Sequence, residues 1–142
     1  MNATELMFGD WVMFSDLKGD GLTEAQILPP KMIRFSFELV YTWVLSKFNG
    51  TLQNCVARMS PIPLTPEILE RNGWEQRNDD AKFFPGTWVG SLLLRKEKEG
   101  FRLLVISDYD DEDTNNTPIV IRYVHELQHI LRLMNIDKEI KL

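Results

Sequence analysis

The stretch "SPIPLTPEILERNGW", residues 60–74, constrains the fold of this chain most, because it divides the sequence into two parts of different character. Pro61 and Pro63 favour an extended connection, since proline fixes φ and disfavours helix in the residue before it. We therefore expect two subdomains, residues 1–60 and residues 61–142, with the joint between them.

A short helix over 66–72 follows the prolines. Thr65 is a good N-cap, and Pro66 suits the first helical position, where its missing N–H is not needed. Gly73 is suited to the residue that ends a helix with positive φ. Two leucines have the spacing of a hydrophobic staple around the helix start: Leu64 and Leu69.

Residues 1–60 have the pattern of a β-rich, small barrel-like (SH3-like) unit. "MFGDWVMFSD" alternates around a Gly9-Asp10 turn and places Val12 and Phe14 on one face. "MIRFSFELVYTWVLSKF" is rich in β-branched and aromatic residues, and "NGT" at 49–51 is a strong hairpin signal. A helix over 38–47 is the alternative, because periodicity is ambiguous for short apolar runs.

Residues 61–142 predict an antiparallel sheet packed by a C-terminal helix. "AKFF", "GTWVGSLLLRK" and "GFRLLVIS" predict strands, "EKEG" a hairpin tip, "DYDDEDTNNTP" an acidic loop and "PIVIRYV" a last strand. The final helix carries an apolar stripe; its members are Tyr123, Val124, Leu127, Ile130, Leu131 and Met134. We expect Tyr123, Leu127, Leu131 and Met134 to pack on the sheet, Asn135 to cap the helix, and "DKEIKL" to be a polar, frayed tail. The whole chain is thus predicted to be α+β.

The charge balance argues against a nucleic-acid binder. The 142 residues carry a net charge of −5, with 5 basic and 6 acidic residues before Pro61 and 11 and 15 from there on. Neither part has the basic excess that phosphate recognition requires. One cysteine, Cys55, excludes an intrachain disulfide, and no apolar run reaches membrane-spanning length. We expect a cytoplasmic protein without membrane contact.

"HELQH", residues 125–129, matches the helical zinc signature H-E-x-x-H. In such a helix His125 and His129 share a cation and Glu126 acts as base on a metal-bound water. We expect the two histidines to lie opposite the Leu127 stripe, facing a cleft or water, with a buried histidine as a further alternative for one of them.

The ligand count argues against a zinc centre. A catalytic zinc needs a third protein ligand, yet the chain has only two histidines and only 13 residues follow His129. We therefore favour a surface helix and assign no catalytic, metal or cofactor residues. A zinc-dependent hydrolase using His125, Glu126 and His129 is the alternative.

Other possible sites are weaker. The acidic loop 108–113 departs from a calcium loop, since Asp113 replaces the required glycine and Ile119 the final glutamate. Cys55 has no His or basic neighbour in sequence and is expected to be a small apolar residue. The four tryptophans are expected in the core, although exposed aromatics on the N-terminal unit would make peptide or single-strand binding arguable.

Three segments, "GDWV", "PIPLTPEILERNGW" and "IRYVHELQHILRLMNID", resemble a group of uncharacterised proteins encoded by gut anaerobic bacteria, their prophages and phages. The related helices often have "VHQLQN", with Gln and Asn in the positions of Glu126 and His129, so the resemblance implies no zinc enzyme. The ending "ILRLMNID" departs from that group's pattern. The resemblance implies a mobile-element origin and no known activity.

The sequence thus predicts a non-enzymatic binding or adaptor protein of bacterial or phage origin, without cofactor, whose partner is a protein. A small nucleic-acid-binding accessory protein is the other alternative, which the net charge disfavours.

Overall fold

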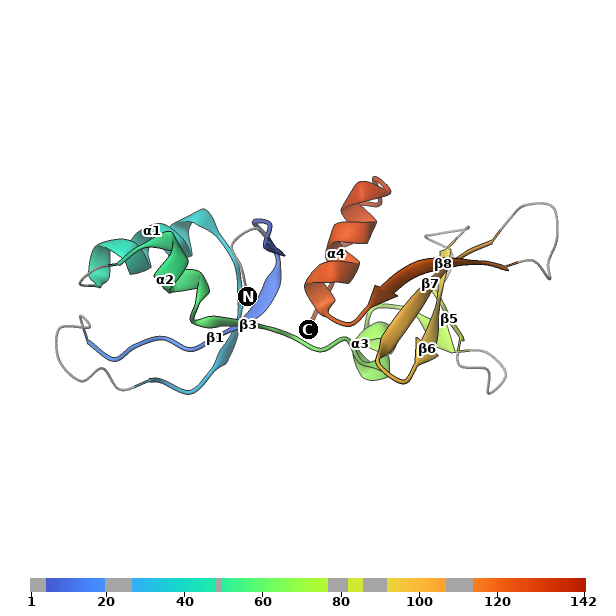
Figure 1. Cartoon of the computed structure of the whole chain (residues 1–142), viewed down its shortest axis with the longest axis horizontal. Helices are drawn as coiled ribbons and strands as arrows, with labels where there is room; N and C mark the ends of the chain where they lie inside the picture. The colour runs from blue at the N-terminus through green and yellow to red at the C-terminus, as the bar shows by residue number, and fades with distance from the viewer. Residues whose placement is uncertain (1–4, 20–26, 48–49, 77–81, 86–91, 107–113) are drawn as a thin grey trace. The chain divides into compact units, whose positions relative to one another are not determined.

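The computed structural model describes residues 5–19, 27–47, 50–76, 82–85, 92–106 and 114–142. The chain divides into two compact units, Met1–Ile62 and Pro63–Leu142, which are described separately (Figure 1). The described residues contain four helices and two antiparallel sheets, which confirms the α+β class. Both sheets are open, so the SH3-like barrel predicted for residues 1–60 is not confirmed.

The first unit contains a three-stranded sheet of order β2-β1-β3. Its strands are β1 (Trp11–Phe14), β2 (Lys31–Arg34) and β3 (Met59–Pro61). Gly9 precedes β1 with φ of 94°, as its place in the predicted turn requires. Val12 and Phe14 are buried and alternate with half-buried Trp11 and Met13, so the predicted alternation is confirmed.

The strand predicted beyond residue 37 is wrong. The segment forms helix α1 (Phe37–Ser46), which was the alternative at 38–47. Ser36 caps it, because its hydroxyl accepts a hydrogen bond from the N–H of Leu39 at 3.1 Å. The hairpin predicted at "NGT" is also wrong: a second helix, α2 (Leu52–Val56), follows, and the hydroxyl of Thr51 caps it.

Helix α1 packs one face into the core of the first unit. The indole of Trp43, which is buried, donates from Nε1 to Oδ1 of Asp16 at 2.9 Å. The buried hydrophobic cluster of this unit consists of Leu6, Val12, Phe14, Phe35, Trp43, Cys55, Val56 and Met59. Leu39, Val40 and Val44 pack against it from α1. A buried polar atom needs a hydrogen-bond partner, and Asp16 provides it for the indole.

The second unit begins with the predicted short helix, α3 (Pro66–Arg71). The hydroxyl of Thr65 accepts from the N–H of Ile68 at 3.3 Å, Pro66 lies in the first turn, and Gly73 has φ of 84°. The N–H of Gly73 bonds to the carbonyl of Glu70, and that of Trp74 to the carbonyl of Leu69, both at 3.0 Å. This is the Schellman arrangement that ends many helices, and the predicted helix is confirmed.

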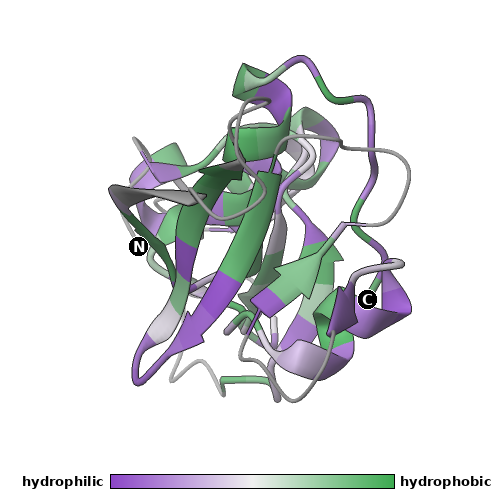
Figure 2. Cartoon of the chain, turned by 90° about the vertical axis from the view of Figure 1, so that its right-hand side faces the viewer, coloured by the Kyte–Doolittle hydropathy of each residue, from purple (hydrophilic) through white to green (hydrophobic). Residues whose placement is uncertain are grey.

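A five-stranded antiparallel sheet of order β4-β5-β6-β7-β8 follows. Its strands are β4 (Glu75–Gln76), β5 (Lys82–Phe84), β6 (Leu92–Glu97), β7 (Gly100–Ile106) and β8 (Thr114–Ile121). The predicted tip "EKEG" joins β6 to β7 with Glu97 opposite Gly100. Leu92, Leu93 and Leu94 are buried in β6, and the long strands are hydrophobic over most of their length with hydrophilic residues toward one end (Figure 2).

The predicted acidic loop "DYDDEDTNNTP" is partly wrong. Its residues 108–113 lie outside the described residues, and its remainder, from Thr114 to Pro118, belongs to β8. Strand β8 is an edge strand, and its register with β7 shifts between Arg102 and Leu104. Proline is tolerated in such a place, because an edge or a bulge does not need its missing N–H.

The last helix, α4 (Val124–Leu133), buries Val124, Leu127 and Leu131. Met134 was expected in the packed stripe, but it follows the helix as its C-cap and is 41% exposed. Asn135 has φ of 57° and ends the helix much as predicted.

The frayed tail predicted for "DKEIKL" is wrong. Ile140 is 1% exposed, and Lys141 is held by hydrogen bonds to Asn72. The polar composition of this segment gave no indication that Ile140 would be buried.

Candidate interaction surface

The two histidines of "HELQH" lie side by side near the start of α4. Their ring centroids are 5.6 Å apart, and the ring of His125 also stacks on Tyr123 at 5.8 Å. His125 is only 5% exposed, whereas His129 is half-buried. The expectation that both face a cleft or water is therefore wrong for His125, which adopts the alternative of a buried histidine.

Glu126 is occupied at the helix start. Its Oε2 accepts hydrogen bonds from the backbone N–H of Arg122 at 2.6 Å and of Tyr123 at 3.0 Å. A glutamate at the third helical position commonly caps the N-terminus in this way. The carboxylate that a zinc hydrolase would use as base is thus bonded to the backbone before the helix.

Among the described residues, no group of three or more His, Cys, Asp or Glu side chains is placed to hold a metal ion. The thiol of Cys55 belongs to the first unit, and "HELQH" belongs to the second. The acidic loop 108–113 lies outside the described residues.

Cys55 is fully buried in α2. Burial, and to a lesser extent the charge of Asp16, raises the pKa of its thiol to about 11. Because the thiolate is the reactive form, this side chain is unsuited to nucleophilic chemistry. It serves as the small apolar residue that was predicted.

The first unit carries a row of exposed, mostly aromatic side chains. The sequence suggested exposed aromatics on this unit only as a condition for binding and did not identify the residues. Phe37, Tyr41 and Leu45 recur every fourth residue along α1 and are 67%, 56% and 69% exposed. Phe8, which is 61% exposed, joins this row from the segment before β1. We name Met7, Phe8, Phe37, Tyr41 and Leu45 the aromatic surface.

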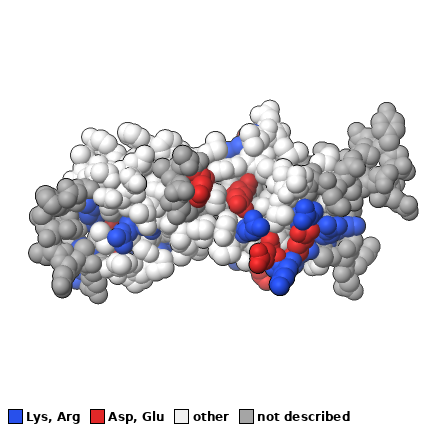
Figure 3. All heavy atoms as spheres, in the orientation of Figure 1, with Lys and Arg blue, Asp and Glu red and all other residues white. Residues whose placement is uncertain are grey.

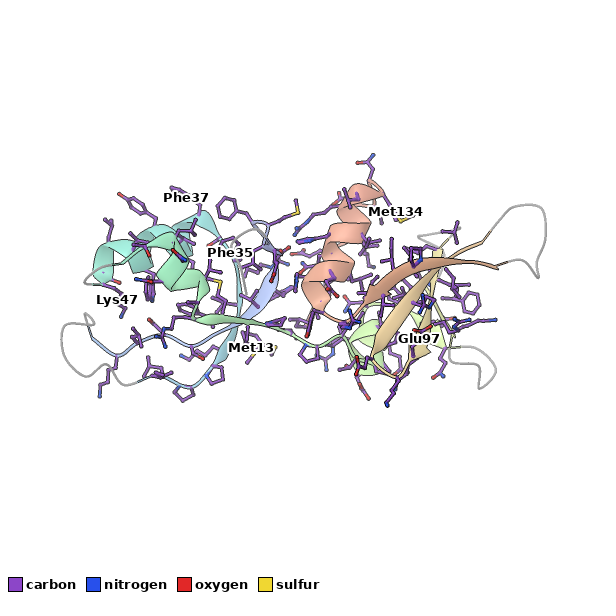
Figure 4. All side chains as sticks on the ribbon, viewed as in Figure 1. Met13, Phe35, Phe37, Lys47, Glu97 and Met134 are labelled. Atoms are coloured by element: carbon purple, nitrogen blue, oxygen red, sulfur yellow. The ribbon has the colours of Figure 1, made fainter. Side chains whose placement is uncertain are left out.

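Ring contacts fix the aromatic surface to the core. Phe8 stacks on buried Phe35 with centroids 5.2 Å apart and meets the edge of Phe37 at 6.4 Å. Phe37 stacks on Tyr41 at 5.8 Å. Phe37 projects outward from α1, whereas Phe35 points inward (Figure 4). The exposed rings are therefore held in place by one another.

Charge is sparse around these rings. In the view of Figure 3, the surface over α1 and α2 is formed mainly by uncharged side chains. Glu5 and Glu38, beside Met7 and Phe37 in sequence, are exposed. Lys47, at the end of α1, turns its ammonium to the carbonyls of Leu17 at 2.7 Å and Gly19 at 2.5 Å. An exposed acidic side chain, that of Glu38, therefore lies directly beside Phe37.

A cluster of charged side chains lies on the sheet of the second unit. Lys82, Arg95 and Arg102 are paired across β5, β6 and β7. Glu97 bonds to both arginines, at 2.5 Å from Arg102 and 3.2 Å from Arg95. The hydrogen bond from Arg102 lowers the pKa of Glu97. Because like charges opposite one another repel, Glu97 stabilises this arrangement.

Comparison of the chain with protein-family models, with curated proteins and with solved structures found no match. Within the described part of the chain, no helix has the length and apolar character needed to cross a bilayer.

Proposed function

We propose that this chain is a non-enzymatic binding module and that the aromatic surface of its first unit receives an amphipathic helix of a partner protein. The observation that carries the proposal is the row Phe37, Tyr41 and Leu45, each more than half exposed on one face of a ten-residue helix. Contiguous exposed apolar side chains of this size mark interaction sites in soluble proteins.

The spacing and the charge define the partner. A row with residues four apart forms the ridge that packs into the groove of a second helix. The exposed carboxylate of Glu38, beside Phe37, favours basic residues next to the partner's apolar face and repels phosphate. A protein helix with basic flanks therefore suits this surface better than a nucleic acid.

The resemblance to proteins of gut bacteria and their phages supports a mobile-element origin, and the single cysteine of the chain supports a cytoplasmic setting for this interaction. Both are part of the proposal and rest on the sequence alone.

The test uses a synthetic helix with leucines on one face and lysines beside them, and a matched helix with glutamates in place of the lysines. Binding to the full chain is followed by fluorescence anisotropy of the labelled peptides. We expect the basic helix to bind at least ten times more tightly than the acidic one, and the Phe37→Ser/Leu45→Ser variant to lose that binding.

Leu133→Ser is the control variant, because Leu133 is 82% exposed on α4, in the other unit. It should bind the basic helix as the wild type does. Equal binding by the Phe37→Ser/Leu45→Ser variant, with its circular dichroism unchanged, would contradict the proposal. Tighter binding of a single-stranded oligonucleotide than of the basic helix would identify a nucleic acid as the partner instead. A wild-type dimer that the Phe37→Ser/Leu45→Ser variant abolishes would identify a second copy of this chain as the partner.

A further inference from the structure

The end of α3 in the second unit is joined to a distant segment of the chain through one side chain, that of Asn72. Asn72 is the C-cap of this helix and is 5% exposed. Its Nδ2 donates to the carbonyl of Ile68 at 2.8 Å, which anchors the amide to the last turn. The Schellman arrangement at Gly73 turns the chain away directly after it, and the amide is left to bond outside the helix.

The amide of Asn72 binds one residue of a distant segment on both sides. Nδ2 also donates to the carbonyl of Lys141, and Oδ1 accepts from the N–H of Lys141, both at 2.7 Å. One side chain thus satisfies both peptide groups of a residue, as a neighbouring β-strand would. Such backbone pairing provides affinity without reading the side chain of that residue.

We call the two hydrogen bonds between Asn72 and Lys141 the clamp. The residue before Lys141 supplies an apolar anchor. Ile140 is 1% exposed, although Asp137, Lys138 and Glu139 just before it are exposed. Residues 137–142 form neither helix nor strand. A buried aliphatic side chain followed by a clamped peptide is how extended peptides are bound, with alternate side chains in pockets.

We propose that Asn72 and the site of Ile140 form a recognition site for an extended peptide, and that residues 137–142 occupy it as a displaceable internal ligand. Its external ligand is an extended segment of another protein with an aliphatic residue just before the clamped peptide group. This site is independent of the aromatic surface, which lies in the first unit.

The surroundings allow such exchange. A cavity of about 290 Å³ lies beside the clamp, lined by Arg71, Asn72, Gly73, Lys138, Glu139 and Lys141. The internal segment is tethered to α4, so its effective concentration at the site is high, on the order of millimolar. An external peptide therefore competes only when it binds more tightly or when the internal anchor is weakened.

The test uses the full chain and a labelled peptide of residues 135–142, "NIDKEIKL". Binding is measured by fluorescence anisotropy for the wild type and for Ile140→Ala, whose internal segment lacks the anchor. We expect at least a tenfold tighter binding to Ile140→Ala than to the wild type. The Asn72→Asp/Ile140→Ala variant should lose this gain, because a carboxylate cannot donate to the peptide carbonyl.

A second peptide, with alanine in place of the isoleucine that corresponds to Ile140, should bind none of the variants. Ile140→Val, a smaller change, should increase the affinity for the labelled peptide by an intermediate amount. This variant replaces Ile140→Ala in the test if circular dichroism shows that Ile140→Ala does not fold. Equal peptide binding by wild type and by a folded Ile140 variant would overturn the proposal. Wild-type dimers that Ile140→Ala abolishes would identify a second copy of this chain as the ligand instead.

Discussion

The carboxylate of Glu126 and the backbone N–H of Tyr123 are joined by a 3.0 Å hydrogen bond at the start of α4. The same oxygen accepts from the N–H of Arg122 at 2.6 Å. N–H groups at the start of a helix have no carbonyl within the helix to accept their hydrogen bonds. A carboxylate at this end also lies near the positive end of the helix dipole. Glu126 therefore stabilises the helix start.

Replacing Glu126 should lower stability. We expect Glu126→Ala to reduce the free energy of unfolding by about 1 kcal/mol, the usual effect of removing an N-terminal cap. Glu126→Gln should lose less, because the amide oxygen still accepts both hydrogen bonds. Urea unfolding measures the difference, with Glu99→Ala at the exposed hairpin tip as control. An unchanged midpoint for Glu126→Ala would show that the carboxylate does not cap the helix.

Replacing Asn72 should loosen the clamp on Lys141. Asn72→Ala removes the two hydrogen bonds to the N–H and the carbonyl of Lys141, and we expect a loss of about 2 kcal/mol in the free energy of unfolding. The amide proton of Lys141 should exchange with solvent much faster in this variant, which hydrogen-exchange NMR detects. Gln53→Ala, an exposed residue of α2, is the control. Unaltered protection of Lys141 in Asn72→Ala would disprove the clamp.

The thiol of Cys55 should be unreactive in the folded chain. With a pKa raised to about 11, only about one thiol in a thousand is ionised at pH 8, and burial blocks access. We expect iodoacetamide to label Cys55 at pH 8 only after unfolding in urea. Rapid labelling of the native chain, measured by mass spectrometry, would contradict the burial.

The same pKa predicts a loss of stability at high pH. Between the ordinary value of 9.0 and about 11 the unfolded thiol ionises while the folded thiol keeps its proton. This contribution is fully present below pH 9 and is lost as the pH rises toward 11. Cys55→Ala should show a weaker decline of unfolding temperature over this range. An identical decline in both proteins would assign it to other groups.

Two glycines with positive φ provide a matched pair. Gly100 has φ of 97°, and a Cβ there would lie 2.5 Å from the carbonyl oxygen of Ile121. Gly19 has φ of 82°, but a Cβ there meets nothing within 4 Å. Alanine should therefore cost about 1 kcal/mol of backbone strain at Gly19 and clearly more at Gly100. Thermal unfolding of both variants tests this, and equal losses would refute the steric contribution.

Local chemistry was sufficient to predict α3 from the sequence. Thr65, Pro66 and Gly73 each act within one turn of the backbone, so distant contacts were not needed to place this helix. The β6–β7 hairpin was predictable for the same reason. Helix α1 was not, because "FELVYTWVLS" has apolar residues on every side and its β-branched and aromatic residues favour strands. The Ser36 cap and the burial of Trp43 in the core stabilise the helix over the strand in this segment.

The candidate surfaces depend on tertiary structure and were predictable only in part. The spacing of His125 and His129 placed both on one helix, but not the burial of His125. Phe37 and Trp43 are both aromatic residues of one short segment, and only the packed structure separates the exposed ring from the buried one. Ile140 was hidden in a polar segment because a single anchor produces no periodic pattern.

The bond between Asn72 and Lys141 joins residues 69 positions apart, so it also sets an order of events during synthesis. The helix that precedes Asn72 leaves the ribosome long before Lys141, and the loop between these two residues can close only when Lys141 is available, at an entropic cost that rises with the length of the loop. While translation continues, the amide of Asn72 and the place of Ile140 stand open to any other extended segment nearby. Until residue 141 emerges, the proposed peptide site lacks its internal ligand, so a foreign peptide would meet no competitor there.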